Sequence, residues 1–159
     1  MSRFVDMNGD PIDGIISKEL MPWRIRELGL DWTKGQYQLW TRFGFRSDIL
    51  GGILDMEEGE VSDLASIPKP VHSIFLSPND PRIAGGAWPH DKIYKLEGRL
   101  VLRCGKEVQI TRRQADQLIA FEAMPELMAS RWHRHATYQA LQRGGRRWSN
   151  EHWTSRLKW

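Results

Sequence analysis

The pattern of hydrophobic and polar positions divides the chain into a β-rich first part and a helical second part. Large apolar residues alternate with polar ones at residues 23–27 and 36–45, which is typical of half-buried strands. Residues 48–61 hold a Gly-Gly pair, two adjacent apolar residues and an acidic turn, and so predict a short strand followed by a turn. Residues 1–20 contain three turn dipeptides and predict an irregular lead-in with at most one hairpin.

After Val61 the apolar residues take the spacing of helices. Two prolines, Pro68 and Pro70, predict a loop that leads into a short helix. Residues 82–96 place four residues on one helical face, at positions i, i+3, i+4 and i+7. Pro89 lies among them and predicts either the start of this helix or a kink in it. The four residues that share the face are Ala87, His90, Asp91 and Tyr94.

A hairpin and two further helices complete the pattern. Residues 99–103 and 106–110 flank Cys104-Gly105, which is the spacing of a tight β-hairpin inserted between helices. The last helix is expected at residues 130–142. The chain is therefore predicted to be an α+β protein: an N-terminal antiparallel β region followed by a helical half of three to four helices with an inserted β-hairpin.

The helix after the hairpin has clear boundary signals. Thr111 and Gln114 match a capping box, in which the threonine hydroxyl and the glutamine side chain each bond a free backbone N–H of the first turn. Pro125 disfavours helical geometry in the residue before it. The helix is therefore expected to end at Ala123 or Met124.

Length and composition limit the class of protein. A chain of 159 residues fits one domain, and we expect a single domain over residues 1–145 with a tail at 146–159. Cys104 is the only cysteine, which excludes an internal disulfide framework and a Cys-rich zinc site. No apolar run approaches the roughly 18 residues that a membrane-spanning helix needs, and the first residues lack a signal-peptide pattern, so we expect synthesis in the cytoplasm.

The basic character of the chain is concentrated near its C-terminus. Residues 127–159 carry seven Lys or Arg residues against one acid, together with four of the eight tryptophans. This composition suits stacking on nucleobases, docking at lipid headgroups or burial in a neighbouring protein chain, whereas a solvated extension is the alternative. Nucleic acid ranks last because the rest of the chain is not basic. The candidate partner-binding residues are Trp148, Trp153, Trp159, Arg146 and Arg147.

The candidate chemistry lies in the helical half. His90 and Asp91, with Tyr94 one turn on, are residue types that exchange protons, bind metals and orient one another near neutral pH. Asp116 follows the capped start of its helix and could orient the imidazole, although an aspartate there also stabilises the helix dipole. Asp63 could join them, or could simply cap a turn.

Four short blocks follow one another along the chain: Asp63-Leu64-Ala65-Ser66-Ile67-Pro68, His90-Asp91-x-x-Tyr94, Arg112-Arg113-x-Ala115-Asp116 and Glu122-Ala123-Met124. Together they resemble the successive blocks of the domain of unknown function 1353 family, which is found in bacteriophages and prophages. The resemblance covers roughly residues 36–143. The chain departs from it at Pro89, in the spacing of Phe121 after Asp116, and in the added tail after Gly145.

The residues around His90 are also similar to the His-Asp helix of secreted phospholipases A2. That resemblance implies His90 as the base, Asp91 as a calcium ligand and Asp116 as the orienting carboxylate. A zinc or other divalent site that also uses Asp63 is the variant without this analogy. The glycine-rich calcium loop of those enzymes is hinted at only by Gly85-Gly86. Tyr94 and Ser66 are expected to support the site.

Two functions from different classes remain. The first is a phage-encoded, metal-assisted hydrolase that acts on a cell-envelope ester, amide or glycan, with His90 and Asp116 as its catalytic residues. The second is a non-catalytic virion, tail or assembly component in which the His-Asp network is structural and the tail binds another phage protein or a second copy. Either protein would be made in the host cytoplasm, and the second would be built into the virion. The sequence does not choose between them.

Overall fold

Two small antiparallel sheets form the first part of the chain. The computed structural model describes residues 3–12, 26–27, 37–39, 41–62, 80–144 and 153. In the first sheet the central strand β4 (Phe43–Ser47) lies between β1 (Phe4–Val5) and β5 (Gly52–Met56). In the second sheet β3 (Tyr37–Gln38) lies between β2 (Arg26–Glu27) and β6 (Val61–Ser62). The predicted N-terminal antiparallel region is confirmed. The prediction of an irregular lead-in over residues 1–20 did not include β1, which is held in place by its pairing with β4.

The first sheet supplies the aromatic half of the core. Phe43 pairs with Met56, and Phe45 pairs with both Leu54 and Phe4. All five side chains are buried, because residues two apart on a strand point to the same face. Their burial explains why the alternating apolar pattern of this stretch survives in the folded protein as one covered face.

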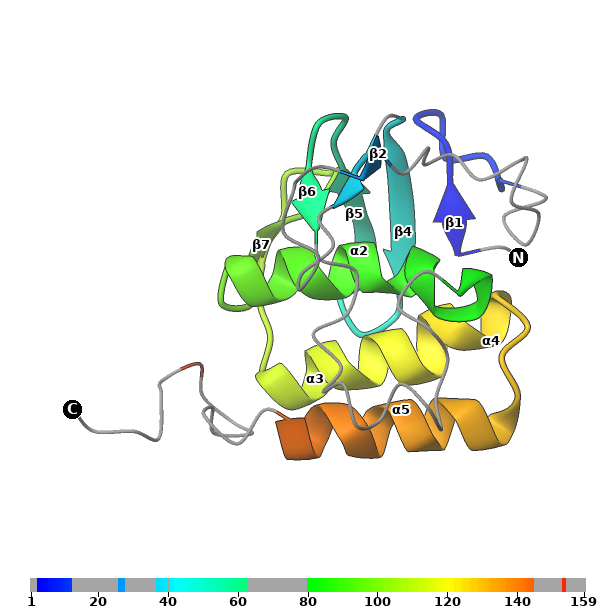
Figure 1. Cartoon of the computed structure of the whole chain (residues 1–159). Helices are drawn as coiled ribbons and strands as arrows, with labels where there is room; N and C mark the ends of the chain where they lie inside the picture. Colours follow the sequence, from blue (N-terminus) through cyan, green and yellow to red (C-terminus); the bar gives the residue numbers. More distant parts are fainter. Residues whose placement is uncertain are drawn as a thin grey trace.

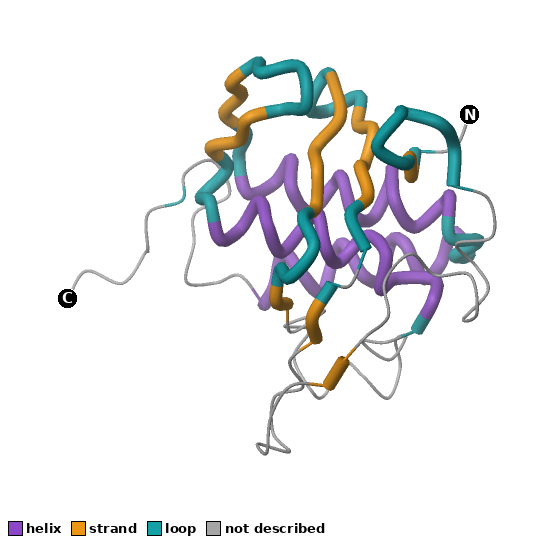
Figure 2. The backbone as a smooth tube through the Cα atoms, turned by 90° about the horizontal axis from the view of Figure 1, so that it is seen from above, coloured by secondary structure: helices purple, strands orange, loops and turns teal. Residues whose placement is uncertain are grey.

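The second part of the chain consists of helices packed beneath the strands (Figure 1). Helix α2 lies nearest the sheets, a continuous row of α3, η1 and α4 follows, and α5 packs on that row from the other side. Seen from above, the strands cross over the helices (Figure 2). The bounds are α2 (Pro81–Lys95), α3 (Arg112–Gln117), η1 (Leu118–Ala123), α4 (Met124–Glu126) and α5 (Arg131–Gly144).

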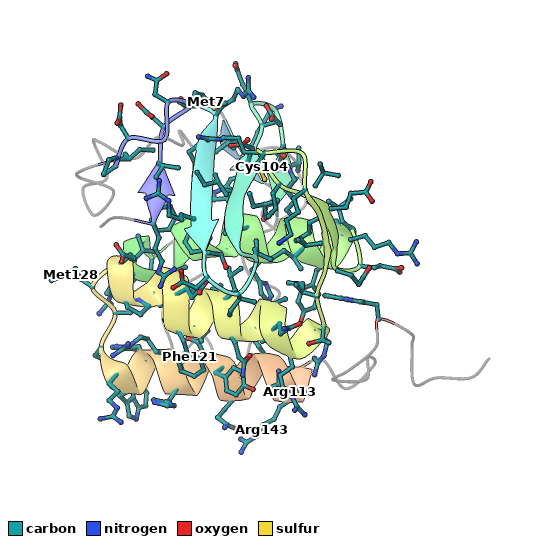
Figure 3. The ribbon with its side chains drawn as sticks, turned by 180° about the vertical axis from the view of Figure 1, so that it is seen from behind. Met7, Cys104, Arg113, Phe121, Met128 and Arg143 are labelled. Atoms are coloured by element: carbon teal, nitrogen blue, oxygen red, sulfur yellow. The ribbon has the colours of Figure 1, made fainter. Side chains whose placement is uncertain are left out.

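The inserted hairpin is confirmed. It is formed by β7 (Arg99–Val101) and β8 (Glu107–Gln109), which pair antiparallel between α2 and α3. Cys104 is exposed in the turn between these strands, at the strand end of the molecule (Figure 3). No helix among the described residues is long and apolar enough to cross a membrane.

Helix α2 runs through its internal proline. Asp80 caps the helix by accepting the backbone N–H of Arg82 at 2.9 Å, and Pro81 occupies the first turn, where a missing N–H costs nothing. Pro89 lies inside the helix, so the alternative in which the helix starts at this proline is wrong. The helix carries His90 in its C-terminal half as a result.

The helix row after the hairpin begins as predicted and ends later than predicted. The capping box of Thr111 and Gln114 is present, with bonds of 3.2 and 2.9 Å. Residues 118–123 then form a wider π-helical turn, and α4 continues through Pro125. Because Pro125 lies where the wider turn gives way to α-helix, its lack of an N–H and its ring are accommodated there, and the expected stop at Ala123 or Met124 is wrong.

Helix α2 and the π-helical turn touch almost backbone to backbone. A side-chain carbon at Gly86 would lie 2.6 Å from Cβ of Ala123 and 3.1 Å from Ile119, so only glycine fits at this crossing. Gly85 and Gly86 are interior residues of α2 and do not form the glycine-rich loop that the phospholipase resemblance suggested. The close approach is what brings the side chains of α2 within reach of α3.

Candidate functional site

The carboxylate of Asp116 is the centre of the candidate site. It is fully buried near the end of α3 and receives hydrogen bonds from two other helices. On Oδ1 it bonds Nε2 of His90 at 2.9 Å and the phenol of Tyr94 at 2.6 Å, both from α2. On Oδ2 it accepts from Nε2 of Gln142 in α5 at 2.5 Å. The predicted pairing of His90 with Asp116 is therefore present as a direct contact.

A buried arginine balances the charge of this carboxylate. Arg112 lies one helical turn before Asp116, is 1% exposed, and places Nη1 4.0 Å from Oδ2 of that carboxylate. The same nitrogen donates to the carbonyl of Leu141 at 3.5 Å. A buried charge is costly unless it is paired and hydrogen-bonded, and Asp116 meets both conditions. The carboxylate of Asp116 therefore has its hydrogen-bond partners inside the helix layer.

The imidazole of His90 is oriented by this carboxylate. A carboxylate only accepts, so when the imidazole of His90 is neutral its proton lies on Nε2 in the shared bond and Nδ1 keeps a lone pair. Among the described residues no hydrogen bond involves Nδ1. The side chain is 13% exposed, so it is mostly but not fully buried. Its other support is the ring of Tyr94, whose centroid lies 4.4 Å away.

Tyr94 is a permanent donor in this network. Burial raises the pKa of its phenol, and the negative charge of Asp116 and the bond to that carboxylate raise the pKa further. Arg112 works in the opposite direction through its charge and its bond to the phenol. The net shift keeps Tyr94 protonated, so that Asp116 has a fixed donor beside His90.

The predicted metal ligands are not brought together in the described part of the chain. Asp91 forms an ion pair with Lys95 one turn on, at 2.9 Å, and Nε2 of His90 is taken by Asp116. No three His, Cys, Asp or Glu side chains among the described residues are grouped so that they could hold a metal ion. Asp63 and Ser66 lie outside the described residues. The donors that are described therefore do not fit a metal site by themselves.

One residue of the predicted partner-binding tail contacts the site. The indole of Trp153 donates to the carbonyl of Ile110 at 2.8 Å and lies edge-on to the ring of Tyr94, with centroids 4.9 Å apart. The remaining four tail residues, Trp148, Trp159, Arg146 and Arg147, lie outside the described residues.

A second buried carboxylate joins the helices to the sheet. Glu122, in the π-helical turn, accepts from Oγ of Ser47 at 2.5 Å and from the backbone N–H groups of Asp48 and Ile49 at 3.0 and 3.2 Å. Arg3 lies 3.5 Å from the same carboxylate. Its carboxylate bonds these four groups of the protein itself. Glu122 therefore ties the turn between β4 and β5 to the helices and is not available to a ligand.

Sequence reasoning missed the roles of Gln142, Arg112 and Glu122. The i, i+4 spacing of Arg112 and Asp116 on a helix signals an ion pair and could have found the arginine. Gln142 is 26 residues from Asp116 in the sequence and has an ordinary surface composition around it, so no local signal marks it. Its role depends on how α5 packs against α3.

Comparison with known families finds a match over most of the chain. Residues 37–141 match the family described as "Protein of unknown function (DUF1353)". No curated protein and no solved structure matches the chain.

The raised pKa of Tyr94 predicts how the protein titrates in alkali. The folded state holds this proton more tightly than the unfolded chain, so the stabilisation is complete below the unfolded pKa of about 10 and is lost as the pH rises above it. Under native conditions at roughly pH 11, wild type and Tyr94→Phe should show the same phenolate absorbance. In denaturant, wild type should show one additional phenolate. A smaller native signal in Tyr94→Phe would mean that the phenol ionises readily and is not held by Asp116.

Proposed function

Since the chain belongs to the family described as protein of unknown function (DUF1353), a description that names no activity, we propose its function from the site: a hydrolase in which His90 is the general base. The observation that carries the proposal is the 2.9 Å bond between Nε2 of His90 and the buried carboxylate of Asp116. This bond leaves the opposite ring nitrogen with a lone pair, which is the form a base requires.

In the proposed reaction a water molecule gives its proton to Nδ1 of His90 while its oxygen attacks the substrate. The imidazole then carries a positive charge, which the carboxylate of Asp116 stabilises across their shared bond. The same nitrogen later returns the proton to the leaving group. A positioned base of this kind typically accelerates a reaction by about 10²–10⁴-fold.

The surroundings of Asp116 support this role because they are already in place before any substrate arrives. Tyr94 and Gln142 occupy the carboxylate oxygens from two different helices, and Arg112 lies beside them. A carboxylate so held cannot rotate away from His90 without breaking several bonds. A preorganised charge costs no reorganisation when the imidazolium forms.

The substrate class and the setting rest on the family resemblance, not on the geometry. The sequence blocks of this chain resemble those of a family found in bacteriophages and prophages, so we propose a bacteriophage setting with an ester, amide or glycan of the cell envelope as the substrate. The basic, Trp-rich tail would then contact other phage proteins or a second copy of the chain.

A second function is favoured by one specific observation. Asp116 ties α2, α3 and α5 together through buried bonds, and His90 is only 13% exposed. The same network would serve a non-catalytic virion or assembly component by fixing one arrangement of three helices. The two functions differ in what His90 contributes. A base is needed for turnover, whereas a structural donor is needed for folding.

The substitution His90→Gln separates these functions. The amide can still donate to Asp116 but cannot accept and return a proton, so the hydrolase loses about 10²–10⁴-fold in kcat while its melting temperature stays close to that of wild type. Turnover would be measured on activated esters and on purified peptidoglycan. His135→Gln is the matched control, because that exposed imidazole contacts Phe121 and should leave turnover intact.

Two other outcomes would contradict the proposal that His90 is a general base. Hydrolysis that survives in His90→Gln would remove His90 from the chemistry. A wild-type protein without turnover on either substrate, together with a lowered melting temperature for His90→Ala, would favour the structural function, because Asp116 then loses one of its buried donors.

Metal assistance by calcium or zinc remains a separate proposal that depends on Asp63. Asp91 would have to exchange its ion pair with Lys95 for the ion, and no step of the proposed reaction passes through a metal. If Asp63 and Asp91 hold an ion, calcium or zinc at about 100 times its Kd should stabilise the fold by about 2.7 kcal/mol, and a chelator should reverse the rise in melting temperature. Asp63→Asn should abolish the rise. Identical melts with calcium, zinc and chelator would exclude metal binding at this site.

A further inference from the structure

The side chain of Trp153 packs in a fitted space beside the candidate site. Its indole N–H donates to the carbonyl of Ile110, the residue just before the cap of α3. A side-chain carbon at Gly98 would lie 2.4 Å from the indole nitrogen, so the glycine leaves the space that the ring needs. Gly98 lies just after the end of α2 and has no side chain that would occupy this space. The indole therefore packs against Gly98, which lies just after α2, and Ile110, which lies just before the cap of α3.

The ring of Tyr94 also packs against the indole of Trp153. The two rings meet at an interplanar angle of 87°, which is the edge-to-face arrangement that aromatic pairs prefer. Tyr94 in turn contacts His90 through its ring and Asp116 through its phenol. A residue that fixes the ring of Tyr94 therefore affects both groups that hold the imidazole of His90: the Tyr94 ring itself and the carboxylate of Asp116.

Trp153 also lies outside the part of the chain that defines the family. The family match ends at residue 141, whereas the tryptophan comes from the segment beyond it. We propose that Trp153 is a positioning residue of the His90 site: it holds Tyr94, and through Tyr94 it holds Asp116 and His90. The inference rests on the proposed function, because a site without chemistry has no imidazole to position for a reaction.

The reactivity of His90 toward diethylpyrocarbonate tests the inference without a substrate. The reagent modifies the unprotonated imidazole nitrogen, and mass spectrometry of digested protein assigns the rate to His90 itself. Trp153→Ala should change this rate by about two- to tenfold, the range that the loss of one aromatic contact corresponds to. Trp153→Phe keeps a ring against Tyr94 but loses the bond to Ile110, so its rate should fall between those of wild type and Trp153→Ala.

Trp132→Ala is the matched control. It removes an equally large indole that is 57% exposed at the start of α5 and packs beside His133. The rate at His90 should not change in this variant. Melting temperatures of all variants show whether each is folded, and if Trp153→Ala does not fold, Trp153→Phe decides.

The outcomes separate this inference from the proposed function. Wild-type reactivity of His90 in the Trp153 variants, or an equal change in Trp132→Ala, would overturn the positioning role whether or not the protein is a hydrolase. A changed rate in the Trp153 variants, in a protein whose turnover survives His90→Gln, would instead overturn the proposed function and leave the contact between Trp153 and the His90 network established.

Discussion

The fold of the helical half depends on one buried negative charge. Asp116 has no exposed surface, so its carboxylate must find its hydrogen bonds within the protein. It finds them on both neighbouring helices, with His90 and Tyr94 on one side and Gln142 on the other. This requirement fixes the order and the rotation of α2, α3 and α5, because a turned helix would leave a buried donor or acceptor unmatched.

A second buried carboxylate, that of Glu122, lies on the same row of helices and joins this row to the sheet. Glu122 points to the turn between β4 and β5 and to Arg3, while Asp116 points between the helices. Glu122 lies within the π-helical turn that follows Asp116, and this wider turn changes the angular position of its residues relative to those of α3. One continuous helix therefore attaches to the sheet at one end and to its neighbouring helices at the other. The irregular turn is also where Gly86 lets α2 approach closely.

Much of this could be predicted from the sequence because the signals were local. The capping box at Thr111, the hairpin around Cys104-Gly105 and the helical spacing of His90 and Tyr94 each depend on residues a few positions apart. The pairing of His90 with Asp116 was also predicted, from the chemistry of the two side chains. These features follow from patterns that short-range geometry imposes.

The remaining features depend on contacts between distant segments. Strand β1 has only two residues and exists because β4 pairs with it, and Gln142 bonds Asp116 because α5 packs on α3. Pro125 predicted a helix end that the π-helical turn overrides. The predicted residues Asp63 and Ser66, and four of the five in the tail, lie outside the described residues and remain predictions.

Asp116 selects one tautomer of the neutral His90 ring, with the proton on Nε2 and the lone pair on Nδ1. Nitrogen-15 NMR of the histidine rings tests it most directly, because protonated and unprotonated ring nitrogens have well separated chemical shifts. In wild type at a pH where the ring is neutral, Nε2 of His90 should show the protonated shift and Nδ1 the unprotonated one, and Asp116→Asn should bring the two shifts together. Averaged shifts in wild type, or the opposite assignment, would contradict the account.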